Sequence, residues 1–279
     1  MKLGDLEISI LSEGALKLDG GAVFGMIPRP VWETRMPPDA SNRVTLGLNQ
    51  LLVRGAGFVL LVDAGLGDKL TPRQRAYHGI ETLASWEERL GPHGLGVSDI
   101  THLVITHLHY DHVGGATRFT EDGKECVPVF PNARVFVQAG EWNDAVRPNE
   151  RTRSSYLLHG ILPLHESGRL VLISGDIEPL PGIQLKVTGG HTAHHQMVLV
   201  NGGGSRLAWP ADLCPTSCHL NATWQSAFDL FPLDSLRARQ KFLDQTLNTK
   251  TLVIFNHDPV ARLCRIVGDI DEPQAVDHA

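Results

Sequence analysis

The sequence contains 279 residues, of which 42% are hydrophobic and 20% are charged. This composition is typical of a soluble globular protein, and the length allows a large hydrophobic core. Lysine and arginine together number 25 and aspartate and glutamate 31, so the formal net charge is −6. An acidic chain without a Lys/Arg run lacks the positive surface that nucleic-acid binding needs, and we expect no nucleic-acid partner.

Short apolar runs separated by turns predict a chain rich in β-strands. The runs 50–53 and 58–62 flank a glycine-containing turn and indicate a β-hairpin. Apolar residues at helical spacing predict helices over 80–90 and 235–247. The predicted strands, in chain order, are 8–11, 50–53, 58–62, 101–106, 133–138, 170–173, 183–187, 197–200, 206–209 and 251–255.

Residues 19–43 are rich in glycine and proline and predict an irregular segment. The segment carries Phe24, Met26 and Trp32, and apolar residues in such a loop usually pack against the domain. A lid over a pocket and a contact in a homodimer are the alternatives. Because no linker of low complexity divides the chain, we predict a single domain, 1–279, with a strand-rich core and flanking helices.

The number of cysteines and the lack of long apolar runs indicate where in the cell the protein is located. Four cysteines are too few for a disulfide framework in a chain of this length. Asp5 and Glu7 stand where a signal peptide needs an apolar run, and the longest apolar stretches, such as 58–62, are far shorter than a membrane span. We therefore predict a cytoplasmic protein that does not associate with membranes.

Histidine is abundant, at 14 of 279 residues. Three histidines and a carboxylate fall within six residues, in the pattern His107-x-His109-x-Asp111-His112, which follows the predicted strand 101–106 and precedes two glycines. Side chains at the end of a strand that turns into a helix can converge on one point. Imidazole nitrogens together with a carboxylate oxygen are ligands suited to zinc or a similar divalent metal.

The pattern His107-x-His109-x-Asp111-His112 resembles the signature of the metallo-β-lactamase-fold hydrolases. The later elements of that signature are also present: a histidine in a Gly-His-Thr context, His191, an aspartate at a strand end, Asp212, and a histidine after a late strand, His257. The resemblance spans residues 45–260. It implies an α+β fold, the αβ/βα four-layer sandwich, in which two sheets pack face to face with helices outside.

The resemblance also implies a ligand set for two divalent metal ions, expected to be Zn²⁺. His107, His109 and His191 would hold one ion, and Asp111, His112 and His257 the other. Asp212 would bridge the two. Asp63 matches a family position that usually contacts a metal ligand from behind. His194 and His195 are expected to have structural roles, and the remaining histidines to lie at the surface or in satisfied polar positions: His78, His93, His102, His159, His165 and His278.

Such a site catalyses hydrolysis, because two metal ions activate a shared water, and Asp111 could return a proton to the leaving group. Segments 19–25 and 211–232 resemble the quorum-quenching N-acyl-homoserine lactonases, whose relatives include methyl parathion hydrolase-like organophosphate triesterases and arylesterases. The sequence departs from some lactonases at Pro215, where they carry a catalytic tyrosine. A di-iron redox protein and a non-catalytic metal-binding protein are distant alternatives.

The same resemblance suggests a substrate pocket for a small molecule. Its candidate lining residues are Phe24, Met26, Trp32 and Trp224, for which plain packing is the competing interpretation, and His219, which lies close enough to Asp212 in sequence to reach the pocket.

Overall fold

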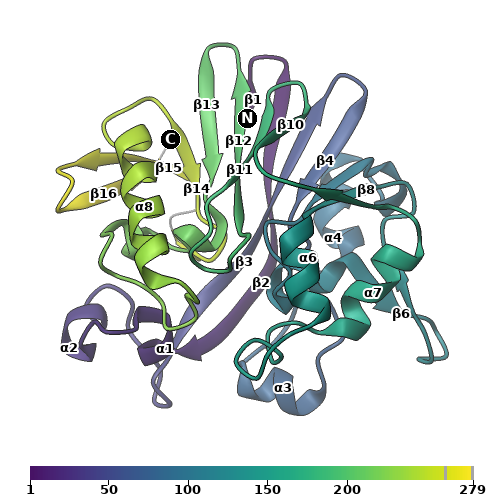
Figure 1. Cartoon of the computed structure of the whole chain (residues 1–279), viewed down its shortest axis with the longest axis horizontal. Helices are drawn as coiled ribbons and strands as arrows, with labels where there is room; N and C mark the ends of the chain where they lie inside the picture. Colours follow the sequence, from purple (N-terminus) through teal and green to yellow (C-terminus); the bar gives the residue numbers. More distant parts are fainter. Residues whose placement is uncertain (261–262, 278–279) are drawn as a thin grey trace.

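Two seven-stranded β-sheets lie face to face in the computed structural model, which describes residues 1–260 and 263–277 (Figure 1). The first sheet contains, in spatial order, β1 (Lys2–Leu3), β2 (Leu6–Asp19), β3 (Arg43–Gly55), β4 (Phe58–Val62), β5 (His102–Val104), β8 (Arg134–Gln138) and β9 (Leu170–Ile173). The second contains β10 (Ile177–Leu180), β11 (Ile183–Val187), β12 (Gln196–Gly202), β13 (Ser205–Trp209), β14 (Leu252–Ile254), β15 (Leu263–Gly268) and β16 (Pro273–Asp277). A small separate ribbon pairs β6 (Thr117–Phe119) with β7 (Cys126–Pro128).

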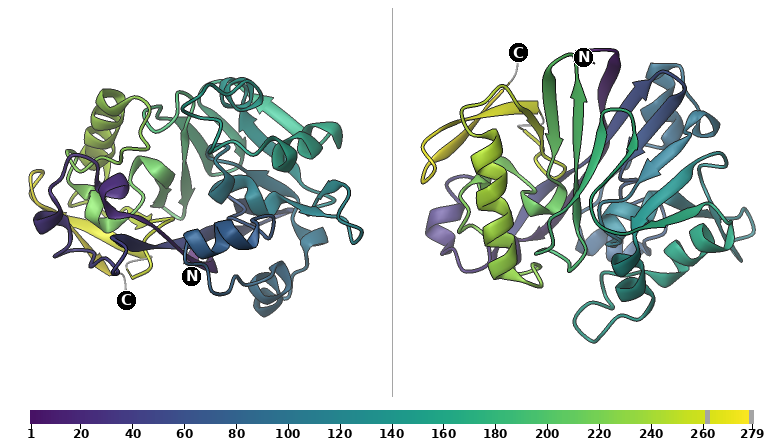
Figure 2. Two further views of the ribbon diagram at one scale, coloured as in Figure 1. Left: turned by 90° about the horizontal axis from the view of Figure 1, so that it is seen from below. Right: turned by 45° about the horizontal axis from the view of Figure 1, so that its top comes forward.

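Helices cover the outer faces of both sheets. Three helices pack on the first sheet, α4 (Trp86–Leu90), α6 (Ala139–Val146) and α7 (Leu158–Glu166), and α8 (Pro232–Thr246) packs on the second. Figure 2 shows these layers from two further directions. The other helices of the described residues are short: α1 (Gly20–Phe24), α2 (Arg29–Trp32), α3 (Pro72–Tyr77) and α5 (Tyr110–Val113).

The alternation of side chains along each strand produces three apolar layers. In β3, Leu51 and Val53 face the second sheet, where they meet residues such as Val198 and Leu207. Leu52, between them, points outward into the layer beneath α4, α6 and α7. The strands are apolar on both faces because both faces are covered, which confirms the predicted four-layer α+β sandwich.

The observed elements differ from the predicted ones mainly at their ends. The helix predicted over 80–90 occupies only Trp86–Leu90, because the Ser85 side chain accepts from the Glu88 amide and the Glu88 side chain accepts from the Ser85 amide, a capping box that starts the helix there. The strand predicted over 101–106 is limited to His102–Val104, because the chain then turns to present Thr106 to Asp63.

Several elements were not predicted. The segment 19–43 is less irregular than expected, since β2 continues to Asp19 and α1 and α2 follow it. The other elements that the sequence did not predict are α3, α6, α7, β1, β6, β7, β10, β15 and β16. None of the helices in residues 1–260 and 263–277 has the length and hydropathy needed to cross a lipid bilayer. His278, expected at the surface, lies outside the described residues.

Candidate metal centre

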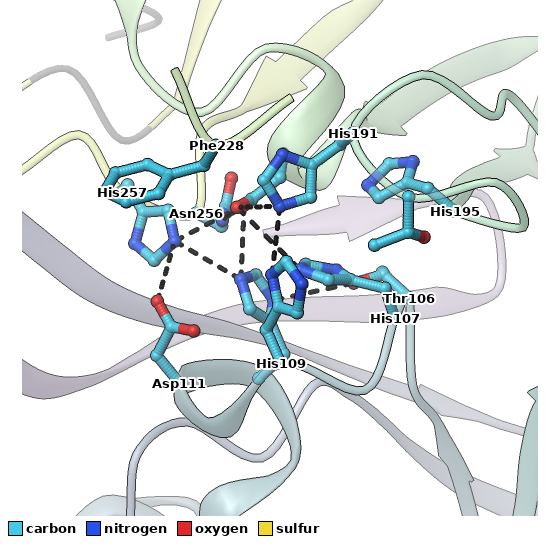
Figure 3. A network of polar contacts seen from close by, with 12 residues as sticks. Thr106, His107, His109, Asp111, His191, His195, Phe228, Asn256 and His257 are labelled. Carbon is cyan, nitrogen blue, oxygen red and sulfur yellow. Dashed lines mark hydrogen bonds and ion pairs between the residues drawn. The ribbon is translucent and has the colours of Figure 1, made fainter. Parts of the chain in front are cut away.

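The predicted metal ligands gather at one edge of the two sheets. His107 and His109 lie in the loop after β5, and Asp111 and His112 belong to α5. His191 follows β11, Asp212 lies in the short 3-10 turn after β13, and His257 follows β14. Figure 3 shows the side chains from these separate elements converging on one another. The loops therefore bring together residues up to 150 positions apart (257 − 107).

The seven side chains form three overlapping groups of metal-ligating atoms, in each of which the atoms lie within 4.8 Å of one another. The groups are His107–His109–His191, His107–His112–Asp212 and Asp111–His112–His257. Asp212 connects them through its two oxygens. Its Oδ1 lies 3.2 Å from His112 Nε2 and 3.3 Å from His257 Nε2, and its Oδ2 lies 3.3 Å from His191 Nε2.

The ligand atoms of these side chains suit a shared cation better than they suit hydrogen bonds with one another. His191 Nε2 and His109 Nδ1 lie 3.1 Å apart, and His257 Nε2 and His112 Nε2 lie 3.3 Å apart. His107 Nε2 is buried without a hydrogen-bond partner in the described part of the chain. Burial lowers the pKa of His107 and of His109 well below the ordinary histidine value. Both rings are therefore neutral at physiological pH, the form that binds metals.

The outer ring nitrogens of His112, His257 and His191 each have a partner that orients the ring. His112 Nδ1 donates to Asp63 Oδ2 at 3.1 Å, and Asp63 also accepts from the Thr106 amide at 2.8 Å. The position expected for Asp63 from the sequence is thus the one it occupies. His257 Nδ1 donates to the Gly47 carbonyl oxygen at 2.8 Å. Partners of this kind select the ring tautomer and aim the remaining nitrogen at the metal.

Two buried carboxylates that the sequence analysis did not single out complete this support. Asp229 Oδ1 lies 3.0 Å from His191 Nδ1 and accepts a hydrogen bond from it. Glu141, on α6, accepts from the Leu108 amide at 3.0 Å and from the Thr192 hydroxyl at 2.6 Å. Because Leu108 and Thr192 each adjoin metal-ligand candidates, Glu141 ties the two ligand loops together. Asp229 lies in the lactonase-like segment 211–232, but nothing in the sequence pairs it with His191, and Glu141 belongs to no motif.

Of the two histidines expected to have structural roles, His195 lies behind the centre, with its ring beside those of His107 and His191, and His194 lies on the α6 side of the loop next to Gly140. His195 is fully buried, its Nδ1 lies 2.6 Å from the Thr188 hydroxyl, and burial lowers its pKa to about 3. The His194 ring packs against Gly140, where a Cβ atom would approach it to 2.3 Å. This contact explains how the chain accommodates a histidine at position 194.

A cavity of about 560 Å³ opens over the ligand cluster. His109, Asp111, His191, Asp212 and His257 all line it, so the ligand-bearing face is accessible to a small molecule. The wall also includes six aliphatic side chains: Leu18, Val23, Leu46, Leu70, Leu157 and Leu230.

The structure differs from the predicted pocket lining for four of the five residues. Phe24 and Trp32 are fully buried and stack on each other with ring centroids 5.2 Å apart, behind the wall. Trp224 meets the edge of Phe24 in the same cluster and is not among the described residues that line the cavity. Met26 is 93% exposed, at the surface. His219 alone of the five lines the cavity, with its ring stacked on Phe24.

The fold and this ligand cluster are those of a known family. The sequence model of the metallo-beta-lactamase superfamily matches residues 45–257, and the chain belongs to that superfamily. It is a metal-dependent hydrolase. Among curated relatives, an N-acyl homoserine lactonase from a Bacillus species is 26% identical over 212 residues, which cover 71% of this chain and 76% of the relative.

Two solved structures are also similar. A probable metal-dependent hydrolase from Staphylococcus aureus has a TM-score of 0.88 at 29% identity, with all of both chains covered. AidC, a dizinc quorum-quenching lactonase solved with a product, has a TM-score of 0.82 at 21% identity, with 100% of this chain and 96% of AidC covered. At that identity the likeness to AidC concerns the fold.

Proposed function

We propose that this chain is a dinuclear metal-dependent hydrolase that opens the ring of N-acyl-homoserine lactones. The observation that carries the dinuclear part is the position of Asp212, whose Oδ1 faces His112 and His257 while its Oδ2 faces His191. One carboxylate between two sets of imidazoles is the arrangement required of a bridging ligand. The lactone is supported by similarity to N-acyl homoserine lactonases and by the aliphatic side chains of the cavity wall, which suit an acyl chain.

The residues present fit two metal ions, expected to be zinc. His107, His109 and His191 would hold one, Asp111, His112 and His257 the other, and Asp212 both. When bound, such ions supply an activated water and polarise the carbonyl group of the substrate.

A side chain of the protein can transfer the proton that hydrolysis releases from water. Hydrolysis adds the hydroxide part of water to the lactone carbonyl carbon, breaks the bond from that carbon to the ring oxygen, and leaves one proton for this oxygen. Asp111 lines the cavity, and its Oδ2 lies 3.6 Å from His257 Nε2. Its carboxylate is therefore placed to take the proton from water and deliver it to the leaving oxygen.

A second candidate, hydrolysis of aryl esters or organophosphate triesters, is favoured by Pro215. This residue lines the cavity three positions after Asp212 and has no hydroxyl group. A tyrosine at this position could assist the opening of a lactone ring. Because Pro215 cannot do so, the site has less reason to prefer lactones over other esters.

Metal analysis followed by a substrate panel tests the proposal. We expect about two metal ions per chain and hydrolysis of N-hexanoyl-homoserine lactone in preference to phenyl acetate and paraoxon. Asp212→Ala should abolish turnover, whereas Asp271→Ala, at an exposed acid far along the chain, should not. Preference for paraoxon or phenyl acetate would support the second candidate. Two iron atoms with oxygen reduction would contradict both.

A further inference from the structure

His78 was expected at the surface or in a satisfied polar position, but it lies in the wall of the cavity. It caps the C-terminal end of α3, and its half-buried ring shares the wall with Asp111 and Tyr110. Its Nδ1 is buried beside the main chain of Lys17 and makes no hydrogen bond of normal geometry within the described residues. Its Nε2 has no partner in that part of the protein either. Because Nδ1 is buried, Nε2 is the ring nitrogen that can meet a ligand in the cavity.

Tyr110 offers a second uncommitted group next to His78. The two ring centroids lie 5.9 Å apart, with the planes inclined by 42°. The Tyr110 amide donates to the Ser155 carbonyl oxygen at 3.0 Å, which anchors the residue, while its side-chain hydroxyl has no hydrogen-bond partner among residues 1–260 and 263–277. Tyr110 also lines the cavity.

Two other polar side chains of the wall, His219 and Arg151, are already engaged. His219 has its Nδ1 2.7 Å from the Thr216 hydroxyl and its Nε2 3.1 Å from the Val23 carbonyl oxygen. Arg151 donates to the Ala227 carbonyl oxygen at 2.9 Å. These groups hold the wall together, whereas His78 and Tyr110 keep their hydrogen-bonding capacity for whatever fills the cavity.

A bound ligand must satisfy these two groups, because a polar group buried without a partner costs free energy. Imidazole and phenol can each donate or accept a hydrogen bond. A secondary amide carries one donor, its N–H, and one acceptor, its carbonyl oxygen, so it can engage both at once. An alkyl lactone without an amide would cover the two groups and leave them unpaired.

We propose that His78 and Tyr110 bind the side-chain amide of the substrate and so select N-acyl lactones over alkyl lactones. This inference rests on the proposed lactonase function. It assigns His78 and Tyr110 to recognition at a point remote from the scissile bond, where they act on specificity.

The test uses two variants that keep the rings and remove the polar groups, His78→Phe and Tyr110→Phe. Each is assayed as metal-loaded enzyme with N-hexanoyl-homoserine lactone and with γ-decanolactone, which lacks the amide. We expect kcat/KM for the acylated lactone to fall by about tenfold and that for γ-decanolactone to stay within about twofold. The affinity for the ring-opened product N-hexanoyl-homoserine, measured by calorimetry, should fall in parallel.

His159→Phe is the matched control, because His159 is exposed on α7 and is not among the described residues of the cavity wall. Metal content and thermal unfolding verify that each variant is folded, and His78→Gln provides a second substitution. Equal losses on both lactones, or no loss in either variant, would overturn the inference while leaving the lactonase function standing. If the unsubstituted enzyme opens neither lactone, the proposed function fails and the inference fails with it.

Discussion

His112 Nδ1 donates a hydrogen bond of 3.1 Å to Oδ2 of Asp63, a residue 49 positions earlier in the chain. Asp63 has a positive φ of 58°, and its Oδ2 also accepts a hydrogen bond of 3.3 Å from the Trp209 indole, which holds the carboxylate further. This contact leaves His112 Nε2 free to face Asp212. The orientation of His112 therefore depends on Asp63, the residue that directly follows β4.

We expect Asp63→Asn to weaken metal binding. An amide in place of the carboxylate can present its NH₂ group to His112 and favour the wrong ring tautomer. Loss of such a partner typically costs about 10- to 100-fold in metal affinity or activity. Competition with a chelator measures the affinity directly. Asp271→Asn changes an exposed acid and serves as the control. An unchanged affinity in Asp63→Asn would show that the contact does not orient the ring.

His219 should make stability depend on pH. Burial, followed by the positive charge of Arg239, lowers the pKa of His219 to about 4 in the folded protein, from an ordinary value of 6.5. Because the folded pKa is depressed, the unfolded chain takes up a proton first as the pH falls. His219 therefore contributes stability above pH 6.5 that is lost progressively as the pH falls towards 4, about 3 kcal/mol in all.

Urea unfolding of the unsubstituted protein and of His219→Phe at pH 7.5 and pH 5 tests this. Phenylalanine preserves the stacking on Phe24 but removes the titrating group. The variant should lose less stability between the two pH values than the unsubstituted protein does. Other buried histidines titrate in both proteins, so only the difference between them reports on His219. Identical pH dependence would contradict the assignment.

Trp32 and Met26 come from the same segment, but truncating them should have very different effects on the free energy of unfolding. Trp32 is 1% exposed and stacked on Phe24, whereas Met26 is 93% exposed. Trp32→Ala leaves a cavity and should lower the free energy of unfolding by about 3–5 kcal/mol. Met26→Ala should change it by about 0.5 kcal/mol or less. Chemical denaturation measures both. A large effect of Met26→Ala would mean that its side chain is covered in solution, for example by a homodimer contact through this segment.

The sequence by itself determined the strand-rich α+β class and the nucleus of the centre. His107, His109, Asp111 and His112 lie within six residues after a strand, so local geometry alone brings them together. The positions of His191, Asp212 and His257 followed only from family resemblance, because nothing in a single sequence states that distant loops meet.

The tertiary structure decided everything that depends on long-range contact. Asp229 reaches His191 across 38 positions, and His78 meets the ring of Tyr110 across 32 (110 − 78). Phe24 and Trp32 were candidates for the pocket wall, with plain packing as the alternative, because aromatic residues suit a pocket as well as a core. Their burial is set by the ends of β2 and β3, against which their cluster packs, and no pattern within residues 19–43 contains that information.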